Sequence, residues 1–182
     1  MNRARHTLAI AMLVMALAGC ASRPTPAPSP AVAAPAAASA APLVLPLSSA
    51  AFMEMSASAA LLAVRAAALA EQRSQDREVL ALARLQKANG RGLAGQLSFA
   101  GRRLDLLPAA RLLPHHRQSL DKLARARDFD AAYLAQQRRL IPFMLDIHRA
   151  YAERGRSPTL RPVAELGKQM LEAEARALAA AE

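Results

Sequence analysis

Apolar residues recur at three- and four-residue spacing through most of the chain after residue 47, and this is the period of amphipathic helices. No stretch there alternates apolar and polar residues between turn signals, as a half-buried strand would. The pattern therefore predicts an all-α fold, with five helical segments separated by capping residues and prolines.

The first predicted helix starts after Ser48 or Ser49 as N-cap and runs to about Glu71. The second begins near Ser74, and its apolar stripe continues to residue 100. It passes through the segment 89–92, Asn-Gly-Arg-Gly, where each glycine costs about 1 kcal/mol relative to alanine. We therefore expect a break or distortion of the helix at this segment.

A shorter helix is predicted over about 114–127, followed by the longest helix of the chain. Asp128 or a neighbour is expected to cap this long helix, which runs to Arg154 and ends at Gly155. Pro142 falls inside it and removes one backbone hydrogen bond, so the sequence predicts a kink there.

The last helix is predicted to open with Ser157 as N-cap and Pro158 at the first helical position. Four long helices with short connections favour an antiparallel four-helix bundle, with the shorter helix added to it. We expect one bundle domain over 47–182, preceded by a signal peptide at 1–19 and a tether at 20–46.

The first 19 residues have the features of an export signal. Arg3 and Arg5 form a basic head, an apolar run extends over 8–17, and small residues precede Cys20. The apolar run is about ten residues long, whereas a membrane-spanning helix needs roughly 18 or more.

The sequence Leu17-Ala18-Gly19-Cys20 is similar to a bacterial lipobox, at which signal peptidase cuts before an acylated cysteine. Cys20 is the only cysteine, so we expect lipidation there, with palmitate among the acyl chains. The alternative is an ordinary secretory signal that leaves a free thiol. Ala21 stands where inner-membrane lipoproteins commonly have aspartate, which implies an outer-membrane lipoprotein facing the periplasm.

Residues 21–46 contain seven prolines and ten alanines, with Arg23 as the only charge. Proline at this density favours extended polyproline II and prevents a packed core. We interpret the segment as a disordered, semi-rigid tether that reaches at most roughly 80 Å from the membrane.

The net charge is +10, and loss of Arg3 and Arg5 with the signal would lower it to +8. The basic residues are nearly all arginine and are scattered, as a GC-rich genome would produce. A solvated basic surface is the favoured interpretation, and attraction to anionic envelope polymers is the alternative. The expected compartment, two tyrosines and no tryptophan argue against nucleic acid as a partner.

Two polar residues fall on the predicted inward stripes, Asn89 in the second helix and Glu174 in the last. A buried carboxylate needs a partner or a raised pKa. The favoured alternative is that Glu174 lies at the stripe edge near the frayed helix end and stays in water.

The stretch Phe129-Asp130-Ala-Ala-Tyr133-Leu134, with Tyr151-Ala-Glu-Arg-Gly155 later, resembles the domain of unknown function 4142. The resemblance covers roughly 50–178. It implies a ferritin-like helical bundle of a bacterial periplasmic protein or lipoprotein.

The same resemblance implies histidines at three inward positions, which fall here on Asn89, Ile141 and Glu174. None is histidine, so the metal site that the family implies is expected to be lost, with Ile141 packed in the bundle interior near Asn89 and the last helix. A metal-binding bundle that uses Glu174, Asn89 and nearby carboxylates remains an alternative.

The actual histidines are expected on the surface. His115 and His116 are adjacent, so their side chains point about 100° apart on a helix, and His148 is alone on its helix. No sequence pattern of a hydrolase, P-loop protein or zinc protease is present. The glycine spacing Gly90-x-Gly92-x-x-Gly95 matches a dinucleotide fingerprint only in spelling, because no strand precedes it.

These observations predict a non-catalytic structural or interaction module of the cell envelope, with no cofactor. Its expected partners are the membrane, through Cys20, and either anionic envelope polymers or another envelope protein.

Overall fold

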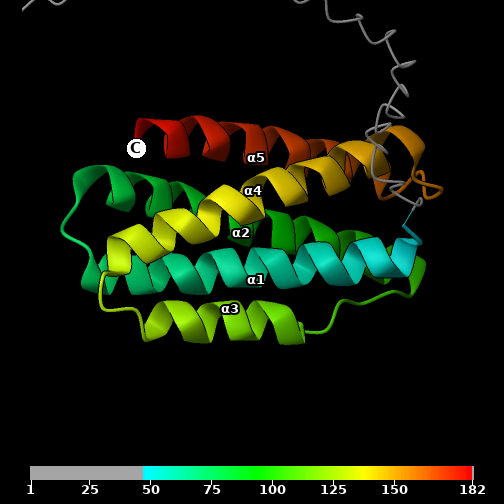
Figure 1. The fold of residues 1–182 in the computed structure, drawn as a ribbon. Helices are drawn as coiled ribbons and strands as arrows, with labels where there is room; N and C mark the ends of the chain where they lie inside the picture. Colours follow the sequence, from blue (N-terminus) through cyan, green and yellow to red (C-terminus); the bar gives the residue numbers. More distant parts are fainter. Residues whose placement is uncertain (1–46, 182) are drawn as a thin grey trace, which may run out of the picture. The chain divides into compact units, whose positions relative to one another are not determined.

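The computed structural model describes residues 47–181, which belong to one compact unit and contain five α-helices and no strand (Figure 1). The helices are α1 (Ser49–Arg73), α2 (Arg77–Leu104), α3 (Pro114–Ala124), α4 (Phe129–Arg154) and α5 (Arg161–Ala180). The predicted signal peptide at 1–19, the lipidation site Cys20 and the tether at 20–46 lie outside the described residues.

The four long helices form an antiparallel bundle. α1 packs against α2 and α4, and α5 packs against α4 and α2, so the four helices enclose one interior. The short helix α3 runs beside α1 and contacts both α1 and α4, which covers the seam between them (Figure 1). The prediction of an all-α bundle with one additional short helix is confirmed.

Side-chain caps start three of the helices. Ser48 Oγ accepts a hydrogen bond from the Ala51 amide at 3.1 Å. Asp76 caps α2 and Asp128 caps α4 in the same way. The predicted caps Ser48 and Asp128 are therefore confirmed, and α4 continues as a helix through Pro142.

The predicted break in the second helix is wrong, because α2 is continuous through the segment 89–92. Gly90 is buried against α1, and a Cβ atom there would lie 2.8 Å from the Ala60 carbonyl oxygen. The missing side chain allows α1 and α2 to approach closely, and this packing offsets the low helix propensity of glycine. With 28 residues α2 is longer than α4, which has 26, so α4 is not the longest helix.

The last helix begins later than predicted. Its N-cap is Leu160, and the proline in its first turn is Pro162 rather than Pro158. Ser157 caps a turn ahead of the helix instead, and its Oγ accepts the Leu160 amide at 3.3 Å.

The helix α3 ends at Ala124, about one turn before the predicted end. There the guanidinium of Arg73 donates to the carbonyl oxygens of Ala124 at 2.8 Å and Ala126 at 2.6 Å. It also lies 4.8 Å from the centre of the Phe129 ring. Arg73 thereby ties the end of α1 to the connection between α3 and α4.

The interior consists of two apolar clusters. One contains Phe52, Met144, Tyr151 and Leu160, and the other contains Leu82, Phe129, Tyr133 and Ile141. Among the described helices α1 is long and apolar enough to cross a membrane by length and composition, but half of its most apolar window is buried in this bundle. Core helices of soluble proteins pass the same test.

Candidate functional site: a polar cluster and a cavity inside the bundle

Five polar side chains meet inside the bundle and form what we call the polar core cluster. They come from α2, α4 and α5, and they are Gln86, Asn89, Tyr133, Gln137 and Glu174. The Gln86 amide nitrogen donates to Gln137 Oε1 at 2.8 Å and to Glu174 Oε2 at 3.2 Å. The other oxygen of Glu174 accepts from Asn89 Nδ2 at 2.9 Å, and Tyr133 donates its hydroxyl proton to Gln86 at 2.5 Å.

The polar core cluster continues toward α3. Gln137 donates to the side-chain oxygen of Gln136 at 3.1 Å. The Gln136 amide nitrogen then donates to Ser119 Oγ at 2.8 Å and to its carbonyl oxygen at 3.2 Å. One hydrogen-bonded chain of side chains therefore connects α5, α2, α4 and α3.

The expectation that Glu174 stays in water is wrong. The residue is 6% exposed because side chains of α2 cover it. Burial raises the pKa of Glu174, and the hydrogen bonds from Asn89 and Gln86 oppose that rise. Burial also raises the pKa of Tyr133, with the Glu174 charge adding to the effect, so this hydroxyl keeps its proton and acts as a donor.

A cavity of about 40 Å³ lies beside the polar core cluster. Its wall is mostly apolar, and it is lined by residues of α1, α2, α4 and α5. The lining includes Ser56, Ile141, Met144, His148, Met170 and Glu174.

His148 is buried, not on the surface as the sequence suggested. It is 0% exposed, and its Nδ1 lies 3.2 Å from the Ala164 carbonyl oxygen. Burial lowers the pKa of His148 to about 4, while the hydrogen bond to Ala164 acts in the opposite direction. The ring fits because Gly167 faces it without a side chain.

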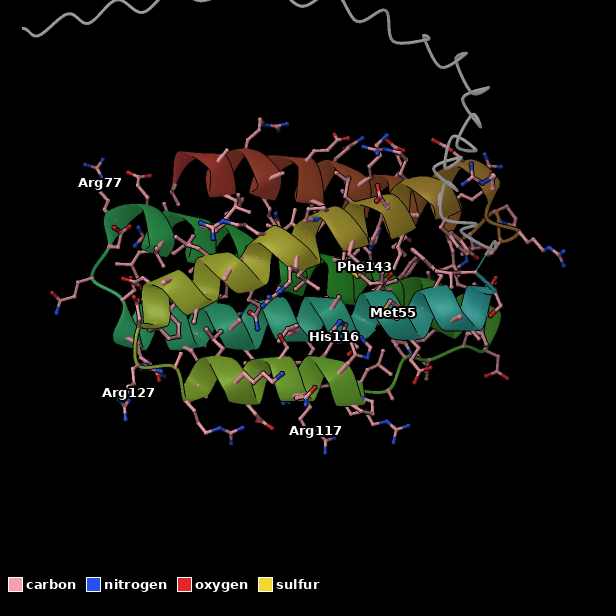
Figure 2. All side chains as sticks on the ribbon, viewed as in Figure 1. Met55, Arg77, His116, Arg117, Arg127 and Phe143 are labelled. Atoms are coloured by element: carbon pink, nitrogen blue, oxygen red, sulfur yellow. The ribbon has the colours of Figure 1, made fainter. Side chains whose placement is uncertain are left out.

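His116 is also buried, at 3% exposed, which corrects the expectation of a surface position. Its Nδ1 lies 2.7 Å from Ser58 Oγ, which in turn accepts the Leu113 amide at 2.8 Å. Burial lowers the pKa of His116 to about 4, and the neighbouring His115 contributes to this shift. Figure 2 shows His116 between α1 and α3. Of the three histidines among residues 47–181, His115 alone is exposed as expected.

The basic residues of α3 and its following connection face outward. Arg117 and Arg127 point away from the bundle in Figure 2, and both are exposed. The large apolar side chains that remain exposed in residues 47–181 are Phe99, Leu107 and Phe143. Arg102 and Arg103 each lie 6.0 Å from the centre of the Phe99 ring.

A family model described as Domain of unknown function (DUF4142) matches residues 31–180. The chain belongs to this family. The match extends upstream of the first helix, into the segment predicted to be a tether. No curated protein and no solved structure matches the chain.

In this DUF4142 member, the three positions at which the resemblance implies histidine lie together. Asn89, Ile141 and Glu174 all line the cavity, and Ile141 is 1% exposed as predicted. Among residues 47–181, no group of three or more His, Cys, Asp or Glu side chains is arranged to hold a metal ion. Asn89 and Glu174 bind each other instead.

Three residues of this interior were not predicted from the sequence, namely Gln86, Gln137 and Ser56. A signal was available, because Gln86 follows Leu82 by four residues and Gln137 follows Tyr133 by four. Polar side chains at the positions of an apolar stripe point inward with it. Ser56 occupies the same kind of position, four residues after Phe52.

Proposed function

We propose that the protein is a lipid-anchored helical bundle of the cell envelope that acts as a non-catalytic structural or interaction module. The observation that carries this proposal is the lipobox-like Leu17-Ala18-Gly19-Cys20, which contains the only cysteine of the chain. Three acyl chains, as in mature bacterial lipoproteins, would make release from the membrane negligible. The proline-rich segment that follows would space the bundle from the membrane surface.

The arrangement of the polar core cluster supports a non-catalytic role. Its carboxylate accepts from the amide side chains of Gln86 and Asn89, and its tyrosine donates to Gln86. Groups that satisfy one another in this way stabilise a unique packing, because a buried polar group without a partner is costly. Glu174 and Tyr133 accordingly serve the fold in this proposal.

Membrane fractionation tests the anchor. The parent protein should remain in the outer-membrane fraction after high-salt and alkaline washes. The Cys20→Ser variant should either be found in the soluble fraction or keep its uncleaved signal peptide. Ala21→Asp should move the protein to the inner membrane, and Ala21→Ser should leave it in place as a matched control. Release of the parent protein by the washes would contradict the proposal.

A second candidate function, binding of anionic envelope polymers, is favoured by the net charge of +10, or +8 without Arg3 and Arg5, and by outward-facing arginines such as Arg117 and Arg127. Such binding is electrostatic, so it should weaken strongly as ionic strength rises. Sedimentation with lipopolysaccharide or peptidoglycan at low and high salt measures this. Association that is unchanged at high salt would exclude the electrostatic mechanism.

The alternative of a degenerate metal site built on Glu174 and Asn89 receives less support. Each of the two Glu174 oxygens already accepts a hydrogen bond. A cation at this place would have to displace amide donors and would meet one carboxylate only. This alternative requires that Glu174→Ala abolish stoichiometric metal binding.

A further inference from the structure

Two buried polar atoms without a hydrogen-bond partner belong to residues that line the same cavity. They are Nε2 of His148 and Oγ of Ser56, and both residues are 0% exposed. The other such atom of the described residues belongs to Asp130, which does not line the cavity. Because unpaired buried polar atoms are costly, each of these two atoms needs a hydrogen-bond partner or a bound ion, and the cavity has room for one.

The tautomer of His148 leaves a free lone pair at Nε2. A carbonyl oxygen only accepts hydrogen bonds, so Nδ1, 3.2 Å from the Ala164 oxygen, carries the proton and donates it. Burial lowers the pKa of His148 to about 4, and the ring is therefore neutral near pH 7. A neutral imidazole nitrogen with a lone pair is a metal ligand or a hydrogen-bond acceptor.

The ring is fixed in position before any ligand binds. It packs edge-on against Phe52, with ring centres 5.2 Å apart and an angle of 71° between the planes. On the α5 side, a Cβ atom on Gly167 would come within 2.2 Å of Nδ1. The glycine therefore provides the space that the ring occupies.

Two methionines line the cavity beside His148. Met144 lies one turn before His148 on α4, so both side chains share a helix face, and Met170 lies opposite on α5. Met144 is 2% exposed, and Met170 packs against the same apolar cluster. Thioether sulfur is a soft ligand that selects Cu(I), while imidazole also suits copper.

The volume of the cavity and the charge of its lining limit which ligands it can hold. The volume of about 40 Å³ exceeds the roughly 10–15 Å³ needed for one water and is far below the roughly 150 Å³ cavity that admits benzene. Glu174 is the only carboxyl group that lines it. The charge of a monovalent cation is balanced by one carboxylate. A divalent ion in this mostly apolar cavity would keep one positive charge without a counter-charge.

We propose that the cavity binds one soft monovalent cation, Cu(I), through Nε2 of His148 and the thioether sulfurs of Met144 and Met170, with Glu174 as counter-charge. The site uses neither Asn89 nor Ile141. It goes beyond the proposed envelope function, whose membrane anchor does not depend on it.

The test uses the full chain with the Cys20 thiol alkylated wherever it is not lipidated, so that no thiolate competes. Ag(I), a redox-inert analogue, is titrated by calorimetry, and Cu(I) is titrated anaerobically against the chelator bicinchoninate. We expect one ion per chain. Met144→Leu and Met170→Leu conserve volume. Each should weaken binding by about tenfold or more, because even loss of a supporting residue behind a ligand costs about 10–100-fold.

Met53→Leu is the matched control, since Met53 is a buried methionine that does not line the cavity, and it should bind as the parent does. Circular dichroism melting verifies that all variants fold. In a spectrum of ¹³C-methyl methionines, Ag(I) should shift the methyl signals of Met144 and Met170 but not those of Met53 and Met55.

The proposal is overturned if no ion is retained. It is equally overturned if both cavity variants bind like the parent, or if a crystal grown with Ag(I) contains only ordered water in the cavity. Each of these results leaves the membrane anchor of the proposed function untouched.

Discussion

Glu174 is buried near the end of a helix, where a carboxylate usually stays in water. Two amide donors, Gln86 and Asn89, compensate for the hydration that it loses. They do so incompletely, since the pKa of Glu174 is raised. The ordinary pKa of this carboxyl group, which applies to the unfolded chain, is 4.5. Because the pKa is higher in the folded protein, the folded state binds more protons than the unfolded state above pH 4.5. Stability therefore falls as the pH rises through this range.

Ile141 tests the packing at this site. It is 1% exposed and lines the cavity, so Ile141→Ala should lower the free energy of unfolding by about 2 to 5 kcal/mol. Leu107→Ala is the control, because Leu107 is 66% exposed and its truncation should change stability little. Chemical denaturation measures both. An alanine variant of Ile141 that melts within about a degree of the parent would be incompatible with this packing.

His116 gives the protein a pH dependence of the opposite sign to that of Glu174. Its folded pKa of about 4 lies below the unfolded value of 6.5, so the unfolded state binds more protons between these pH values and stability falls as the pH drops through them. His116→Asn keeps an acceptor for Ser58 but does not titrate. Its melting temperature should therefore fall less than that of the parent between pH 6.5 and pH 4.

Equal pH profiles for the parent and His116→Asn would show that His116 is solvated in the folded state. The comparison is between two proteins that both contain Glu174, so the opposite contribution of that carboxyl group cancels.

At the scale of elements, substitutions at two glycines of α2 distinguish the effect of helix packing on stability from the effect of helix propensity. Gly90 faces the Ala60 carbonyl oxygen at a distance that excludes a Cβ atom, while Gly95 has nothing within 4 Å. We expect Gly90→Ala to destabilise the protein because α1 must move away. Gly95→Ala, which is exposed, should stabilise it by about 0.5 to 1 kcal/mol.

Thermal melting of the two variants measures this difference. A stabilising Gly90→Ala would mean that the close approach of α1 and α2 is not required.

Much of the helix pattern could be predicted because it is local. The stripes, the caps Ser48 and Asp128, and the end at Gly155 all follow from residues within a turn of each boundary. The continuity of α2 could not be predicted, because it depends on Ala60 of another helix. The start of α5 was predicted too early, because the side chain of Ser157 caps a turn that precedes the helix. A serine followed by proline does not distinguish such a turn from a helix start.

The candidate site was predicted in part. Asn89 and Ile141 could be placed inward from periodicity and from the resemblance, whereas the favoured expectation for Glu174 was that it stays in water. The burial of His148 could not be predicted, because it depends on the space that Gly167 leaves on α5. Met144 and Met170 fall on the apolar stripes of their helices, and sequence alone does not distinguish a core methionine from one that lines a cavity.

For the whole molecule, the interior must supply the stability, because a single cysteine at position 20 allows no disulfide within the chain. The bundle provides two apolar clusters and a hydrogen-bonded polar core cluster that connects four of its helices. The stability of the described bundle therefore rests on apolar packing and on these buried hydrogen bonds.

The most direct test of the central claim is the intact mass of the protein extracted from the membranes of its native host. The account predicts a mature chain that begins at Cys20, lacks residues 1–19 and carries the added mass of its acyl chains. A chain that begins elsewhere, or one with an unmodified Cys20, would contradict it.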